Sequence, residues 1–96
     1  MILLIVNFRD RDTEFLWETG RSRRIPASIR EVAGKKLAIL DAAGSLSELL
    51  SPPGNRLEKL KGSRIGQYSI RINDQYRICF IWKGGDAHQV EIVDYH

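Results

Sequence analysis

The last three residues of the chain bring three titratable side chains of different chemistry together: the carboxylate of Asp94, the phenol of Tyr95 and the imidazole of His96. An imidazole, with an ordinary pKa of about 6.5, can accept or donate a proton near neutral pH. A phenol can stack on a nucleic-acid base, or donate its proton where a neighbouring cation lowers its pKa. The chain end therefore combines a proton-transfer group with an aromatic ring on which a nucleic-acid base could stack.

Cationic side chains precede this terminal group. Arginine presents a planar, permanently charged fork that matches the oxygens of a phosphate. Five cations lie upstream: Lys59, Lys61, Arg64, Arg71 and Arg77. Cations and proton-transfer groups are the parts needed to cleave RNA through its own 2′-hydroxyl, because negative charge builds up at phosphorus. This chemistry requires no metal or other cofactor, and none is predicted, since the two histidines, His88 and His96, show no metal-ligand spacing with Cys79.

Each of these residues also has an ordinary structural interpretation. His96 could be a solvated chain end, and Tyr95 could pack at a sheet edge. Asp94 could pair with an arginine, while Arg71 and Arg77 could be surface charges on the open side of a sheet. The residues by themselves indicate a small domain with a phosphate-binding face, without fixing the reaction.

The composition is that of one soluble globular domain spanning residues 1–96, with 43% hydrophobic and 28% charged residues. The net charge is +3, and the basic side chains are concentrated in two blocks, residues 21–36 and 56–77. Basic blocks indicate a polyanionic partner, although a solvated face is an equal alternative for the first. The single cysteine fits a reducing cytoplasm. The apolar opening, residues 1–8, is too short for a membrane span and lacks the basic leader of a signal peptide.

Two helices are predicted in the first half. The first covers residues 12–19, with Asp12 or Thr13 as N-cap and Gly20 as the stop. The second runs from Pro26 to about Ala43. Its apolar stripe comprises Ile29, Val32, Ala33, Leu37, Leu40 and Ala43. Charged positions outside that stripe predict an amphipathic helix with a basic outer surface.

The second half has β character, after a connector broken by Pro-Pro-Gly. Residues 67–73 alternate between apolar and polar side chains, which places Arg71 opposite the apolar face. The predicted strands are residues 1–8, 56–62, 67–73, 76–82 and 88–96. Helices followed by an antiparallel meander predict an α+β domain with helices packed on one face of the sheet. A final strand paired into that sheet would hold the terminal group in place.

Several stretches, in this order, resemble the HigB (plasmid-maintenance killer) branch of the RelE/ParE toxin superfamily. They are "KLAILDAA", "SPPGNRLEKLKGSRIGQYSIRINDQYRICFIW" and "GDAHQVEIVDYH", within residues 15–96. The resemblance implies a RelE/ParE-like fold with a sheet of about four to five strands. It also implies a toxin of a type II toxin–antitoxin system that cuts mRNA on translating ribosomes without metal. A HigA-like helix-turn-helix antitoxin would neutralise it.

The resemblance assigns roles to individual residues. Lys61 would lie in a basic loop near the active site, and Arg77 would stabilise the scissile phosphate. Asp94, Tyr95 and His96 would form the terminal group, with His96 as the main acid or base. One position departs from the pattern: many relatives read "LHPLKG", whereas this chain reads "LEKLKG" with Glu58 in place of the histidine.

Two functions of Glu58 follow from that departure. It could act as general base if burial raised its pKa, or it could pair with Lys61 or Arg77. It could also mark a weak enzyme, in which proton transfer depends more heavily on His96.

The first basic block would suit docking on ribosomal RNA through phosphate contacts. Its members are Arg23, Arg24, Arg30, Lys35 and Lys36. The same block could instead meet an acidic antitoxin surface. Two other functions are compatible with the fold: a ParE-like inhibitor of gyrase, and a non-catalytic module that binds nucleic acid or antitoxin. The terminal Asp-Tyr-His argues against the gyrase inhibitor, because a binder needs no proton-transfer group there.

Overall fold

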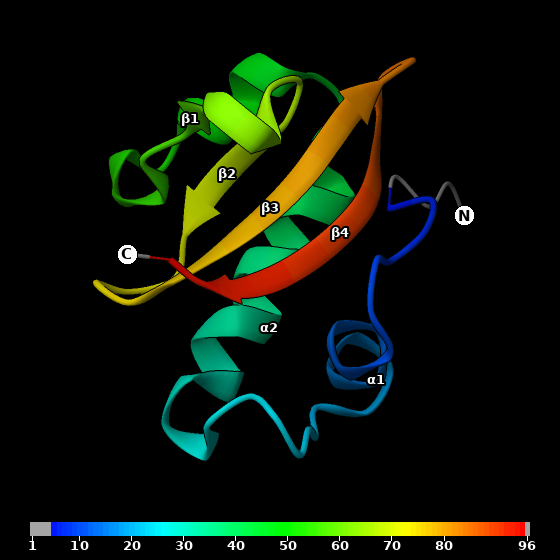
Figure 1. Ribbon diagram of the computed structural model, residues 1–96, viewed down its shortest axis with the longest axis vertical. Coiled ribbons are helices and arrows are strands. Elements are labelled where there is room, and N and C mark those ends of the chain that lie inside the picture. Colours follow the sequence, from blue (N-terminus) through cyan, green and yellow to red (C-terminus); the bar gives the residue numbers. More distant parts are fainter. Residues whose placement is uncertain (1–4, 96) are drawn as a thin grey trace.

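The computed structural model describes residues 5–95, which form helices packed on a four-stranded antiparallel sheet of order β1-β2-β3-β4 (Figure 1). The helices are α1 (Arg11–Thr19) and α2 (Ala27–Ala42), with short 3-10 turns η1 (Leu46–Leu50), η2 (Pro53–Asn55) and η3 (Gly62–Arg64). The strands are β1 (Glu58–Lys59), β2 (Tyr68–Arg71), β3 (Tyr76–Lys83) and β4 (Asp86–Asp94). The predicted α+β class is confirmed. None of the helices within residues 5–95 is long and apolar enough to cross a membrane.

α1 is set by polar groups at both ends. Its N-cap is Asp10, whose carboxylate accepts a hydrogen bond from the backbone N–H of Thr13 at 3.0 Å. The prediction of Asp12 or Thr13 as N-cap is therefore wrong, because the extended backbone at Asp10 starts the helix earlier. Gly20 ends the helix in the left-handed region (φ 77°), as predicted, and donates its N–H to the carbonyl of Leu16.

α2 supplies most of the helical side of the core. Ile29, Ala33, Leu37 and Leu40 are buried on its inner face. Val32 was expected in the same stripe, but 41% of its surface is exposed. At about 100° per residue, Val32 lies roughly a quarter-turn from the centre of the buried stripe, which explains its exposure.

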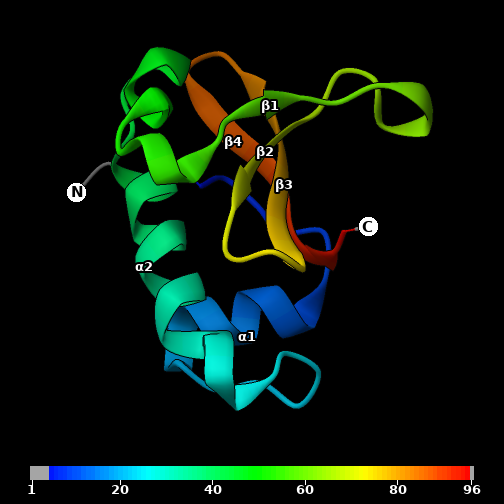
Figure 2. The same ribbon diagram turned by 90° about the vertical axis from the view of Figure 1, so that its left-hand side faces the viewer.

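The two faces of the sheet differ in character. Ile70, Ile78, Phe80 and Ile92 are buried in one core with the α2 side chains. Because side chains alternate along a strand, the intervening residues project to the opposite face. Figure 2 shows α2 on one side of the sheet, and the β1–β2 connection and the carboxyl end of the chain on the other. The sheet therefore presents one face away from α2.

The opening segment differs from its predicted strand. Residues 1–4 lie outside the described residues, and within residues 5–8 only two isolated parallel bridges occur, Ile5 with Ala87 and Phe8 with Val90. These bridges place the segment along β4. The backbone of β4 adopts φ 49° at Gln89, between the two bridged positions, so a continuous ladder does not form.

The end of the chain is held in the sheet up to Tyr95. β4 ends at Asp94, and the next backbone N–H, that of Tyr95, donates to the carbonyl of Gln75 at 2.7 Å. This agrees with the prediction that the last segment pairs beside residues 76–82. His96 lies outside the described residues.

Candidate active site

The face of the sheet away from α2 carries a row of functional side chains across all four strands. Strand register aligns Glu58 with Ser69, Ser69 with Cys79, and Cys79 with Glu91. Two residues along β2 and β3, and therefore on the same face, Arg71 lies directly opposite Arg77. Strands far apart in sequence thus place carboxylates, a hydroxyl and guanidinium groups on one surface, which we call the site face.

Arg77 is largely buried, with only 8% of its surface exposed. Its Nε donates to Oγ of Ser69 at 2.8 Å, and its Nη2 donates to the backbone carbonyl of Arg56. Its Nη1 lies 3.8 Å from Oε1 of Glu58. The guanidinium is therefore fixed by groups from two other segments. The interpretation of Arg77 as a simple surface charge of an open sheet is wrong.

Glu58 lies at the edge of the sheet with about half of its side chain exposed (51%). A role as general base depended on burial, which the structure does not provide. The alternative, that Glu58 pairs with Arg77, is confirmed by the 3.8 Å separation. Because Glu58 is exposed, this ion pair adds little to the stability of the fold, and its main effect is to orient the guanidinium of Arg77.

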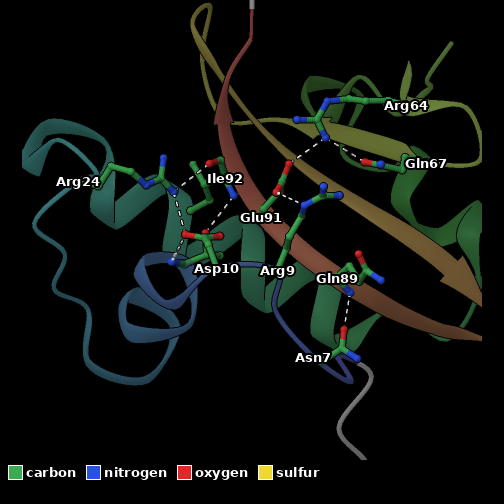
Figure 3. Close-up of polar contacts among 10 residues, drawn as sticks. Asn7, Arg9, Asp10, Arg24, Arg64, Gln67, Gln89, Glu91 and Ile92 are labelled. Atoms are coloured by element: carbon green, nitrogen blue, oxygen red, sulfur yellow. Dashed lines mark hydrogen bonds and ion pairs between the residues drawn. The ribbon is translucent and has the colours of Figure 1, made fainter. Parts of the chain in front are cut away.

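Arg64 and Glu91 form a close ion pair on the site face (Figure 3). Arg64 Nη1 lies 2.8 Å from Oε1 of Glu91 and also donates to Gln67 Oε1 at 3.1 Å. The second carboxylate oxygen of Glu91 lies 3.3 Å from Arg9 Nε. Burial alone would lower the pKa of Arg64, but the hydrogen bond and charge of Glu91 outweigh it, so the pKa is raised.

Glu91 and Arg9 did not stand out in the sequence. Alternation along residues 88–94 assigns Glu91 to a face, but an isolated glutamate on a strand is usually solvated. Only the register with Cys79 and the position of the β1–β2 connection show that Arg64 lies above it.

Cys79 lies beneath these charges and is fully buried. Burial, the largest effect, raises the pKa of its thiol to about 11, while the charges of Arg64 and Arg77 lower it and that of Glu91 raises it. Strand register aligns Cys79 with Ser69, which binds Arg77, and with Glu91, which binds Arg64. The thiol is protonated near neutral pH and behaves as the predicted small apolar side chain.

The terminal group is only partly described. Tyr95 is half-buried, and its phenol is close enough to act electrostatically on Arg64. Asp94 is exposed, and its Oδ2 accepts a hydrogen bond from Gln75 Nε2 at 3.0 Å. By strand alternation, Tyr95 follows Glu91 and Val93 on the site face.

The other three predicted phosphate-binding residues do not share the surroundings of Arg64. Lys59 takes the register of Tyr68, so strand alternation directs it to the face opposite Glu58, and the structure does not bring it to the site face. Lys61 is exposed where the η3 turn begins. Arg71 forms an ion pair with Asp74 in the β2–β3 connection.

A hollow lies beside β4, next to Asp94. It is lined by Asp10, Asp12, Arg24, Glu91, Ile92, Val93 and Asp94. Four of these side chains are carboxylates, so the hollow does not suit a phosphate.

The first basic block is mostly engaged within the protein. Arg24 lies 3.1 Å from Asp10 and 3.4 Å from Asp12. Arg30 donates to the backbone carbonyls of Ile25 at 2.9 Å and Ser22 at 2.6 Å. Arg24 thus links the α1–α2 connection to the start of α1, and Arg30 links α2 to that connection. Arg30 in particular is not part of a free basic surface.

The two lysines of the block differ from each other. Lys35 is exposed and lies 3.3 Å from Glu31 one turn earlier. Lys36 is half-buried and donates to Asn55 at 2.5 Å. Burial, and then the positive charge of Arg71, lower the pKa of Lys36. The prediction of a basic outer surface on α2 is therefore wrong for Arg30 and Lys36, and it remains for Lys35, with Arg23 exposed nearby in the sequence.

Within residues 5–95, no three His, Cys, Asp or Glu side chains are grouped so that they could hold a metal ion.

Comparison with known proteins identifies the family. Residues 6–96 match the family described as "RelE-like toxin of type II toxin-antitoxin system HigB". The chain is 46% identical over 85 residues to "Toxin HigB-1" of Vibrio cholerae, covering 88% of this chain and 90% of that protein. It is 31% identical over 93 residues to "Endoribonuclease HigB" of Proteus vulgaris, covering 97% and 100% of the two chains.

A solved structure, the "YoeB-YefM complex from Staphylococcus aureus", shares the fold with a TM-score of 0.62 at 22% identity, covering 100% of this chain and 99% of that one. The likeness of that chain agrees with the observed arrangement of helices and sheet. Together with the match over residues 6–96, these comparisons show that the chain belongs to the HigB family of RelE-like toxins of type II toxin–antitoxin systems.

Proposed function

We propose that this toxin is an endoribonuclease that cleaves mRNA on translating ribosomes. The carrying observation is that Arg64, held by Glu91, and Arg77, held by Ser69, lie on the site face, to which strand alternation also assigns Tyr95. Guanidinium groups there would stabilise the charge that develops on a phosphate during attack by the 2′-hydroxyl. The relative from Proteus vulgaris is named an endoribonuclease, which supports the same activity for this chain.

The residues divide the chemistry among them. Arg77, fixed by Ser69 and Arg56, would contact the scissile phosphate, and Arg64 would provide a second cation. Tyr95 would stack on a base that is unstacked from its neighbours. His96 would be the main acid or base, taking the proton of the 2′-hydroxyl or giving a proton to the leaving 5′-oxygen, since imidazole titrates near neutral pH.

Glu58 takes a supporting role in this proposal. Its ion pair with Arg77 fixes a guanidinium edge, and its exposed position does not suit proton transfer. Proton transfer then depends more heavily on His96, so we expect slow turnover. Lys61 and Arg71 would attract the RNA backbone from the border of the site face rather than contact the reacting phosphate.

The partners follow from the family and the proposed activity. A helix-turn-helix antitoxin would bind and neutralise the toxin, and the ribosome would present the mRNA. The substrate places the protein in the cytoplasm. Among the residues predicted to dock on ribosomal RNA, Arg23 and Lys35 are best placed, because both are exposed. Arg24 is also exposed but is paired with Asp10 and Asp12.

The proposal is tested by mapping mRNA 5′ ends after a short pulse of expression, together with growth. New ends inside translated reading frames are expected for the wild type. They should be absent for His96→Gln and for Arg77→Lys, which retains a positive charge but not the fork that bonds Ser69 and Arg56. Intact mRNA with inhibited gyrase would contradict the proposal in favour of a gyrase inhibitor, and intact mRNA without gyrase inhibition would indicate a non-catalytic binder.

Two controls make the result interpretable. Each variant should still bind the antitoxin, because loss of binding would show a misfolded protein rather than an inactive site. Exposed Lys83 provides the matched control, because it lies at the opposite end of β3 from Arg77. Lys83→Gln also removes a cationic side chain and should still produce cleavage.

A further inference from the structure

Glu91 is the only described side chain of the site face that binds two arginines from different segments. Its oxygens lie 2.8 Å from Arg64 Nη1 and 3.3 Å from Arg9 Nε. The Glu91 side chain is only 12% exposed, whereas those of Arg64 and Arg9 are 32% and 53% exposed. The carboxylate is therefore a nearly buried anchor for two partly accessible cations.

Arg64 ends the η3 turn in the β1–β2 connection. The η3 turn spans three residues, and Gly62 and Gly66 on either side of Arg64 adopt positive φ. A backbone hydrogen bond from Leu60 N–H to the Gln67 carbonyl at 2.9 Å closes the segment at its base. Its tip is linked to the sheet by Arg64, whose contact with Glu91 reaches across to β4.

The geometry leaves Arg64 usable by a ligand. Among residues 5–95, both contacts of its guanidinium, to Glu91 and to Gln67, use Nη1. Nε and Nη2 then remain for a phosphate.

We propose that Glu91 is a positioning residue for RNA cleavage, acting through Arg64. This inference rests on the proposed function. The carboxylate fixes the direction in which Arg64 presents its free edge to the phosphate, while itself touching no substrate. Removal of the Glu91 carboxylate would lower the rate of the chemical step, because Arg64 would lose its fixed orientation. RNA binding would not weaken, because the site face would become more positive.

A double-mutant cycle measured on ribosomes tests this. Glu91→Ala should lower the single-turnover cleavage rate by about tenfold or more without raising KM. Glu91→Gln, which keeps an oxygen that can accept from Arg64, should recover part of that rate. In an Arg64→Ala background, Glu91→Ala should have no further effect. Independent, multiplying effects of the two changes, or a raised KM with an unchanged rate, would overturn the proposal.

Arg9→Ala is the matched control, because it removes the other arginine from the same carboxylate. It should leave the cleavage rate within about twofold, while its effect on thermal unfolding reports the purely structural part of the cluster. Equal losses of rate in Arg9→Ala and Glu91→Ala would contradict a role through Arg64.

A readout without catalysis separates this inference from the proposed function. In NMR spectra of the free toxin, slow rotation should give separate guanidinium nitrogen signals for Arg64, and these should merge in Glu91→Ala. Identical Arg64 signals in both proteins would overturn the positioning role even if the wild type cleaves mRNA. An inactive wild type with the expected spectral change would refute the proposed function and leave the anchoring of Arg64 supported.

Discussion

Arg77 and Ser69 are joined by a hydrogen bond of 2.8 Å from Nε to Oγ, in a part of the sheet where both residues are buried. The serine hydroxyl thus fixes one edge of a guanidinium whose other nitrogens reach Arg56 and Glu58. A buried guanidinium with satisfied donors is held in one orientation, and a buried donor without a partner is costly.

Ser69→Ala should therefore destabilise the protein by about 1–3 kcal/mol, because it leaves Nε of Arg77 without its hydroxyl partner. Cleavage of mRNA should fall as well, since the guanidinium can rotate. Urea unfolding measures the first effect and the cleavage rate the second. Ser63→Ala, at an exposed serine of the η3 turn, should change neither; a stability loss equal to that of Ser69→Ala would contradict the explanation.

The raised pKa of Cys79 predicts a loss of stability at alkaline pH. Its thiol titrates at about 11 in the folded protein, compared with an ordinary value of 9.0. The protonated thiol favours the folded state fully below pH 9, and this contribution is lost as the pH rises from 9 towards 11, because the unfolded chain ionises first. The total is about 2–3 kcal/mol.

Urea midpoints measured between pH 8 and 11 check this prediction. Cys79→Ala removes the titrating group, so its stability should fall less steeply over the same range, whatever other groups titrate there. Parallel curves for the two proteins would show that Cys79 does not contribute. The native thiol should also react slowly with alkylating reagents at pH 8, and rapidly once the chain is unfolded.

Asp10 and Asp12 provide a matched pair of carboxylates at the start of α1. Asp10 caps the helix and binds Arg24 at 3.1 Å, whereas Asp12 lies 3.4 Å from Arg24 and is about half exposed. Asp10→Ala should cost about 1–2 kcal/mol, and Asp12→Ala less than about 1 kcal/mol. Thermal unfolding distinguishes them, and a larger loss for Asp12→Ala would show that the helix begins later.

Arg30 and Lys35 separate internal cations from surface cations on α2. Arg30→Ala removes two hydrogen bonds to backbone carbonyls, those of Ile25 and Ser22, and should destabilise by about 1–3 kcal/mol. Lys35→Ala removes an exposed pair with Glu31 and should change stability by less than about 0.5 kcal/mol. Comparable unfolding midpoints for the two variants would contradict the distinction.

Local patterns were sufficient for most of the secondary structure. Apolar spacing located α2, Gly20 ended α1, and alternation assigned Arg71 and Arg77 to one face and Ile70 and Ile78 to the other. These features depend on neighbours within a few residues, where helix and strand geometry fix which side chains share a face. The N-cap of α1 was predicted wrongly because several neighbouring residues have similar propensity for that position. The opening strand was predicted wrongly because the backbone of β4 at Gln89 interrupts the ladder.

The sequence by itself determined an α+β domain, the strand that carries Arg77, and a final strand leading to Tyr95. Only the tertiary structure decided that Arg77 is buried against Ser69, that Lys59 projects away from the site face, and that Glu91 binds Arg64. Those relationships depend on strand register and on the path of the β1–β2 connection. Both are set by packing between residues far apart in the chain, because a shift of one residue in register moves every side chain of a strand to the other face.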